Sequence, residues 1–184
     1  EPNGVCMLGI RDNRTWITRL GVIPERRRRK TGEFLMRVMI CESIERDKDR
    51  VQLEVIKGNE PAYHLFRKLG FEETRELLII RRPPGQVLPK PYDNLIIEPI
   101  PQDEIAAVLA AREPIAAWTE ETASLLNTGD LEGLRVTISS GETGWVVFQS
   151  SPFQLQHVVL SPTSSDEMLE SLIAAIHQTH PLQD

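Results

Sequence analysis

The chain has 184 residues and a mass of 20.9 kDa, with 40% hydrophobic, 26% charged and 5% aromatic residues. This is the composition of a globular protein with an apolar core, and it excludes a disordered chain and a large base-stacking surface. The net charge of −6 is unevenly divided, because residues 1–94 carry 19 Lys and Arg against 14 Asp and Glu, whereas residues 95–184 carry 2 against 13. This change of sign predicts a domain boundary.

The basic first half predicts a mixed α/β unit in the order β-β-α-β-α-β. The expected elements are a hairpin of two strands, a helix, a strand, a helix that ends at Gly70, and a last strand, over residues 5–10, 15–23, 32–47, 51–56, 60–69 and 77–80. Cys6 and Cys41 lie in apolar settings without metal-ligand spacing. We therefore expect buried thiols, a reducing compartment and no metal site.

Residues 83–94 hold four prolines within nine residues and are predicted to be a linker between domains 1–82 and 95–184. The acidic half predicts the order β-α-α-β-β-β followed by one helix. The expected ranges are 95–100, a helical stretch 102–126 broken at Pro114, then 134–139, 144–150, 154–160 and 166–177. We find neither a signal peptide nor an apolar run near the roughly 18 residues of a membrane span.

The most informative segment runs from Gly21 to Met36, where a strand leads through five consecutive cations, Arg26–Lys30, into a helix. The unpaired N–H groups and the dipole at the start of a helix favour an anion. Guanidinium groups suit a pyrophosphate or a ribose phosphate, and Gly32 lets a ligand approach the backbone. A solvated charged loop and a nucleic-acid patch are the alternatives.

This segment resembles the cofactor loop of the GNAT acyltransferase superfamily, whose pattern is V-x-P-x-x-R-x-x-G-x-G/A. The matching residues are Val22, Pro24, Arg27 and Gly32, while Lys30 stands at the middle glycine. A second block is similar to the family's L-x-V-x-x-x-N-x-x-A-x-x-L-Y-x-x-x-G-F pattern. Its landmarks are Leu53, Val55, Asn59, Ala62, Leu65, Gly70 and Phe71, with Phe66 in place of the tyrosine.

The resemblance covers residues 4–82 and implies a bound acetyl-coenzyme A. The cofactor-binding residues that it implies are Leu20, Gly21, Val22, Arg27, Arg28, Arg29, Lys30, Thr31, Gly32, Asn59 and Phe66. The backbone of Leu20 to Val22 would offer amides to the thioester and its pantetheine arm. Asn59 is equally suited to hydrogen-bond that arm or to cap the following helix.

The order of elements in the acidic half resembles the front half of a second GNAT copy. Its counterpart of the cofactor loop, residues 160–165, has no cation and no glycine, so we expect no coenzyme there. The resemblance therefore implies a tandem GNAT protein of the α/β mixed-sheet class. It would contain one partial cofactor-binding copy and one partial degenerate copy.

The implied activity is transfer of an acetyl group from acetyl-CoA to a primary amine by direct attack in a ternary complex. Glu54 is the candidate catalytic base, and a strand residue facing solvent is the alternative. Phe66 has no proton to give to the departing thiolate, so an inactive acyl-CoA-binding or regulatory module is the competing hypothesis. We expect a small-molecule or peptide amine as partner, a cytoplasmic location and no nucleic-acid or membrane partner. The sequence leaves the oligomeric state open, and a homodimer formed by strand exchange is the alternative to a monomer if these 184 residues are the whole chain.

Overall fold

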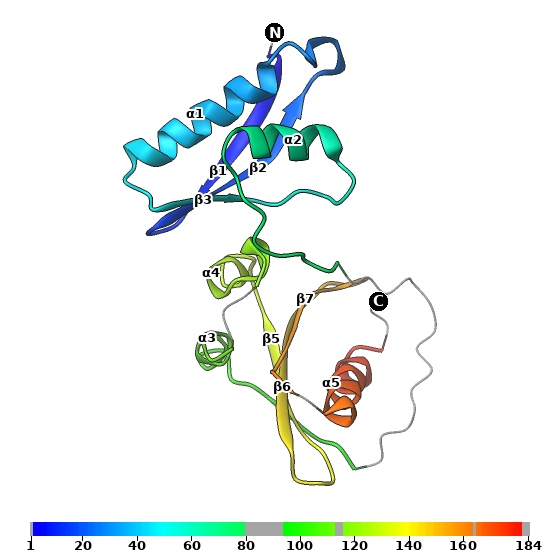
Figure 1. Cartoon of the computed structure of the whole chain (residues 1–184). Helices are drawn as coiled ribbons and strands as arrows, with labels where there is room; N and C mark the ends of the chain where they lie inside the picture. Colours follow the sequence, from blue (N-terminus) through cyan, green and yellow to red (C-terminus); the bar gives the residue numbers. More distant parts are fainter. Residues whose placement is uncertain (1, 80–93, 113–115, 164, 182–184) are drawn as a thin grey trace. The chain divides into compact units, whose positions relative to one another are not determined.

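The structure is a computed structural model that describes residues 2–79, 94–112, 116–163 and 165–181. The chain divides into two compact units, Glu1–Glu76 and Leu77–Asp184, each with its own sheet (Figure 1). The predicted linker 83–94 lies outside the described residues except for Asn94. The domain boundaries of 1–82 and 95–184 therefore stay a prediction.

The first unit contains a three-stranded sheet in the order β1-β2-β3. Its elements are β1 (Gly4–Ile10), β2 (Arg14–Val22), the short 3-10 helix η1 (Pro24–Arg26), α1 (Thr31–Glu45), β3 (Arg50–Leu53) and α2 (Glu60–Lys68). β1 pairs with β2 as the expected antiparallel hairpin, and β2 pairs with β3 in parallel. Gly70, at φ +90°, follows α2 in the left-handed conformation that commonly ends a helix.

Both helices of the first unit pack against the same face of its sheet. Ile17 of β2, Met36 of α1 and Phe66 of α2 form the buried centre of this core, with exposed fractions of 4%, 0% and 9%. Beside it, the hydroxyl oxygens of Thr15 and Ser43 lie 2.8 Å apart and are fully buried. This hydrogen bond joins β2 to α1 and satisfies two polar groups that water cannot reach.

The second unit contains a four-stranded antiparallel sheet in the order β4-β5-β6-β7. Its elements are β4 (Ile96–Pro99), α3 (Ile105–Ala110), the 3-10 helix η2 (Trp118–Glu120), α4 (Thr122–Leu125), β5 (Glu132–Thr137), β6 (Thr143–Ser150), β7 (Leu155–Leu160) and α5 (Asp166–Thr179). The strands fall close to the predicted ranges, and the mixed α/β class is confirmed.

Helices cover both faces of the second sheet (Figure 1). Val146 and Phe148 of β6 face α5, whereas Val147 between them faces the cluster that includes Leu109 of α3 and Leu125 of α4. This alternation follows from the two-residue period of a strand. The expected helical stretch 102–126 is divided into α3, η2 and α4, and Pro114 lies outside the described residues. No helix in the described ranges has the length and apolarity that a membrane span needs.

The strand expected at 77–80 was a wrong prediction for its described part. Residues 77–79 are not in a strand, Leu78 is 86% exposed, and Ile80 lies outside the described residues. Apolar composition does not suffice for a strand, because its N–H and C=O groups also need a neighbouring strand. β3 is also shorter than expected, so Glu54 follows the strand instead of lying within it.

The expectation of buried thiols holds for neither cysteine. Cys41 is exposed and Cys6 is only partly buried. On α1 the buried positions are Met36 and Ser43, whereas the apolar residues Val38 and Ile44 are 41% and 67% exposed. Apolar residues surround the whole of α1, so periodicity alone did not select the face that contacts the sheet.

Replacing Met36 by Ala should destabilise the first unit by about 2–5 kcal/mol, because it removes a fully buried side chain. Phe34→Ala on the same helix is the matched control. Phe34 is 66% exposed, and its truncation should change the free energy of unfolding by less than about 0.5 kcal/mol. Urea unfolding followed by circular dichroism measures both, and equal losses would contradict this assignment of the core.

Candidate functional site

The candidate site begins where β2 and β3 separate. Their parallel pairing runs from Arg14 with Arg50 to Ile17 with Leu53 and stops there. β2 continues through Val22 and stays paired with β1 on its other side. On the side of β3, the backbone of residues 18–22 thus has no strand partner among the described residues, so an amide that faces this side can donate to a ligand.

A β-bulge lies in this free stretch. Between the pairs Val5–Gly21 and Met7–Thr18, two residues of β2 stand opposite the single residue Cys6 of β1. Arg19, the first of the two, has φ +54°. A bulge of this kind turns the following backbone away from regular pairing. The bulge thus contains Leu20 and directly precedes Gly21 and Val22. These three predicted thioester-binding residues are partly buried.

The loop after β2 is held by its own polar contacts. Pro24 begins η1, and Arg27 Nε donates a hydrogen bond to Val22 O at 3.1 Å. Thr31 Oγ1 donates to Arg26 O at 3.3 Å. Arg28 and Lys30 adopt φ angles of +58° and +62°. Lys30 therefore has the left-handed conformation that explains a glycine in the middle of the family's pattern.

The loop brings cations to the open end of α1. The first intrahelical bond runs from Phe34 N to Lys30 O at 2.9 Å, so the amides of Thr31, Gly32 and Glu33 precede it and face the loop. Arg26–Lys30 are all exposed. Within the described ranges, the side chains of Arg26, Arg28, Arg29 and Lys30 make no hydrogen bond or ion pair. Adjacent unpaired cations beside a helix N-terminus form a positive potential suited to a phosphate group.

Gly32 lies where α1, β2 and α2 meet. A Cβ atom added there would lie 3.6 Å from Leu65 Cδ2 and 3.8 Å from Val22 Cγ2, which are ordinary contact distances. The backbone conformation of Gly32 therefore does not demand glycine. An alanine therefore fits, whereas a larger side chain would have to displace Leu65 or Val22.

Glu33, in the first turn of α1, forms an ion-pair network that sequence reasoning missed. It accepts hydrogen bonds from Lys68 Nζ at 2.7 Å and from Arg37 Nη2 at 2.9 Å. Lys68 and, less strongly, Arg37 hold the pKa of the Glu33 carboxyl below its ordinary value, so Glu33 is ionised at neutral pH. The Arg37 contact has a sequence signal in its i,i+4 spacing, but Lys68 lies 35 residues away on α2.

The second block of predicted residues is divided between surface and core. Asn59 directly precedes α2, is exposed, and its side chain makes no capping hydrogen bond. Glu54 is exposed as well. Phe66 instead lies in the core, where its ring stacks edge-on against Phe71 at a centroid distance of 6.2 Å. The described residues contain no group of three or more His, Cys, Asp or Glu positioned to hold a metal ion.

The second unit repeats the bulge. Two residues of β7 stand opposite Phe148 of β6, and the first of them, His157, has φ +53°. A proline follows five residues later in both units, Pro24 in the first and Pro162 in the second. β6, β7 and α5 thus correspond to β1, β2 and α1. His157 also lies 3.1 Å from Glu120, a partner 37 residues away that the sequence did not indicate.

The loop between β7 and α5 differs from its counterpart in the first unit. Ser165 Oγ accepts a hydrogen bond from Met168 N at 3.2 Å, so the chain itself caps α5. Thr163 Oγ1 accepts from Ser165 N and donates to Glu142 Oε1, both at 3.1 Å. Hydroxyl groups and a carboxylate are thus bound at the position where the first unit has free amides and cations.

Comparison with known proteins agrees with this geometry. Residues 1–71 match the model of the acetyltransferase (GNAT) family. Among solved structures, the chain is similar to a tandem GNAT protein from the clavulanic acid biosynthesis pathway, without AcCoA, with 16% identity and a TM-score of 0.57 over 98% of this chain and 68% of that one. It is also similar to a proposed acetyltransferase from Pyrococcus horikoshii, with 17% identity and a TM-score of 0.48 over 95% and 65%. Comparison with curated proteins gives no match.

Residues 1–71, which make up most of the first unit, are thus similar in sequence to the GNAT acetyltransferase family. The chain as a whole shares the fold of the tandem GNAT protein, and it spans about two thirds of the length of each of the two solved structures. The predicted family and fold class are confirmed. The roles of the individual site residues stay predictions.

Lys30→Gly should raise the free energy of unfolding of the first unit by about 1 kcal/mol, because glycine adopts a positive φ without steric cost. Arg29→Gly is the matched control, since it removes the same charge at a residue without a positive φ. That variant should lose stability through the greater backbone freedom of glycine in the unfolded chain. Urea unfolding midpoints compare the two, and equal changes would contradict the role of the left-handed backbone.

Proposed function

We propose that the chain is an acyl-coenzyme A-dependent N-acyltransferase that moves an acetyl group from acetyl-CoA to a primary amine. The observation that carries this proposal is the loop of unpaired cations at the open N-terminus of α1, directly after a bulged strand whose backbone is free on one side. The match of residues 1–71 to the GNAT acetyltransferase family supports acyl transfer in general.

Two parts of the loop are proposed to bind the coenzyme's pyrophosphate. The amides of Thr31 and Gly32 would donate hydrogen bonds to phosphate oxygens, and Arg27 to Lys30 would neutralise their charge. Arg27 bonds to Val22 O through Nε, so its two Nη atoms can still donate hydrogen bonds to a phosphate. Phosphate binding would thereby couple the loop to the end of β2.

The free backbone of β2 is proposed to hold the thioester end. The amides of Leu20, Gly21 and Val22 would bind the pantetheine arm and polarise the thioester carbonyl as the amine attacks. Asn59 would bind the same arm from the start of α2, because its amide group makes no capping bond. Placing the two reactants together would supply much of the acceleration, since the attack needs no covalent enzyme intermediate.

The reaction also needs two proton transfers, one from the attacking amine and one to the departing thiolate. Glu54, exposed just beyond β3, is proposed to take the proton of the attacking amine, directly or through water. Phe66 is apolar and buried, so the departing thiolate would receive its proton from water. The chemical nature of Phe66 also favours a second candidate function, an acyl-CoA-binding regulatory module that performs no transfer.

A calorimetric titration with acetyl-CoA tests the binding step. The wild type should bind with a micromolar dissociation constant and one coenzyme per chain, because Ser165, Thr163 and Glu142 already satisfy the corresponding loop of the second unit. Gly32→Ala should bind within a few-fold of the wild type, since its Cβ meets only ordinary contacts. Gly32→Glu should lose affinity by roughly 100-fold through bulk and like charge. Absence of wild-type binding would overturn the proposal.

A thiol-release assay with acetyl-CoA and a panel of primary amines separates the two candidate functions. The transferase proposal predicts release that depends on at least one amine and disappears in Gly32→Glu. Glu54→Gln should then lower kcat more than it raises KM, because the base acts in the transition state. Saturable binding without release by any amine would support the regulatory module instead.

A further inference from the structure

Glu33 has an unusual pair of partners for its place in the helix. It is the third residue of α1, and its side chain is only 18% exposed, whereas Lys68 and Arg37 on either side of it are 59% and 60% exposed. Lys68 Nζ lies 2.7 Å from Glu33 Oε2, and Arg37 Nη2 lies 2.9 Å from Oε1. Each carboxylate oxygen therefore has its own cation.

A glutamate at the third position of a helix ordinarily folds back onto the amide of the residue before the helix. Here that residue is Lys30, and no side chain caps α1. If the Glu33 carboxylate adopted this conformation, it would bind the amide of Lys30, which directly precedes the amides of Thr31 and Gly32 that the proposed function assigns to phosphate. The carboxylate would also place a negative charge beside an anionic ligand, so in this conformation Glu33 would compete with the ligand for the N-terminus of α1.

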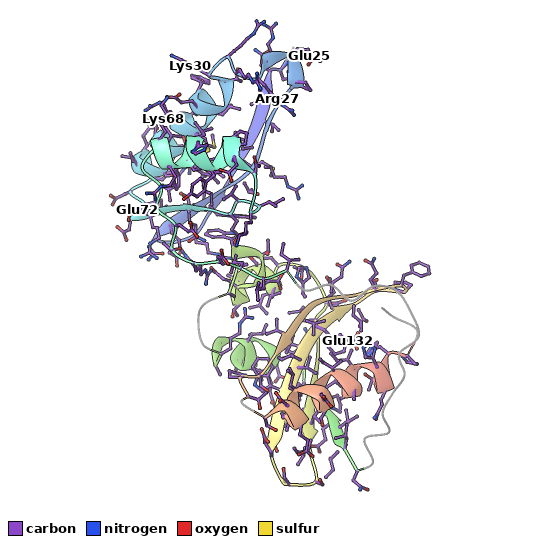
Figure 2. All side chains as sticks on the ribbon, turned by 45° about the vertical axis from the view of Figure 1, so that its right-hand side comes forward. Glu25, Arg27, Lys30, Lys68, Glu72 and Glu132 are labelled. Carbon is purple, nitrogen blue, oxygen red and sulfur yellow. The ribbon has the colours of Figure 1, made fainter. Side chains whose placement is uncertain are left out.

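We infer that Lys68 and Arg37 are positioning residues that hold the Glu33 carboxylate away from the N-terminus of α1 and so keep its amides open for the coenzyme's phosphates. This inference rests on the proposed function. It makes α2 part of the phosphate site, because Lys68 lies in the last turn of α2 and pairs with the first turn of α1 (Figure 2). Lys68 acts through Glu33 and need not touch the ligand.

A double-mutant cycle on acetyl-CoA affinity tests the inference. Lys68→Met retains most of the side-chain length and removes the charge, and it should raise the dissociation constant about two- to fivefold. Glu33→Gln should bind at least as tightly as the wild type, because the competing charge is gone. In the Glu33→Gln background, Lys68→Met should have no further effect, since there is no carboxylate left to hold.

Two results would overturn the inference. If Lys68→Met weakens binding by the same factor in both backgrounds, Lys68 contacts the coenzyme itself. If Lys68→Met leaves the dissociation constant unchanged in both the wild type and Glu33→Gln, the ion pair plays no part in binding. The role of Arg37 is tested in the same way, by measuring the effect of Arg37→Met on the dissociation constant in the wild type and in Glu33→Gln.

Lys57→Met provides the matched surface control. Lys57 forms an exposed ion pair of 2.9 Å with Glu76, elsewhere in the first unit, and its substitution should leave affinity unchanged. Thermal unfolding of each variant separates a loss of folding from a loss of binding. Failure of the wild type to bind acetyl-CoA would count against the proposed function, whereas normal wild-type binding with an unaffected Lys68→Met would count against this inference alone.

Discussion

The end of pairing between β2 and β3 is the constraint on which the first unit's site depends. Four residue pairs join the two strands, and the last is Ile17 with Leu53. Ile17 is also at the centre of the core below α1 and α2, so packing fixes the sheet at the point where it opens. Beyond that point β2 stays paired with β1, and Arg27 of the following loop bonds back to Val22 O. The same strand is thus fixed by the core at Ile17 and unpaired on the side of β3 only a few residues later.

Electrostatics explains why the loop needs a partner of opposite charge. Five adjacent cations repel one another, and the dipole of α1 adds to the positive potential at the same place. Glu33 carries a negative charge in the first turn of α1, yet its carboxylate is bound to Lys68 and Arg37 and not to the loop. The cations of the loop are therefore not neutralised by Glu33. The second unit satisfies the same place internally through Thr163 and Ser165, consistent with its excess of acidic residues.

Local sequence patterns predicted what depends on neighbouring residues. The hairpin, the cation loop, the helix start after it and the stop at Gly70 all have short-range signals, and each is present. Features that join distant segments were missed, such as the Lys68–Glu33 pair and the contact of His157 with Glu120. The expected strand at 77–80 failed for the related reason that strand pairing is a property of two segments. The face of α1 was ambiguous because Phe34, Met36 and Val38 are all apolar, and only Met36 is buried.

The bulge shared by β2 and β7 aligns the two units residue by residue, with Arg19 corresponding to His157 and Pro24 to Pro162. With this alignment, six residues separate the proline from the helix in the first unit, but only three do so in the second. The shorter connection leaves no room for a run of cations or for two left-handed residues such as Arg28 and Lys30. An engineer who wished to give the second unit a coenzyme site would therefore have to lengthen its backbone, because exchanging side chains would not restore the missing loop.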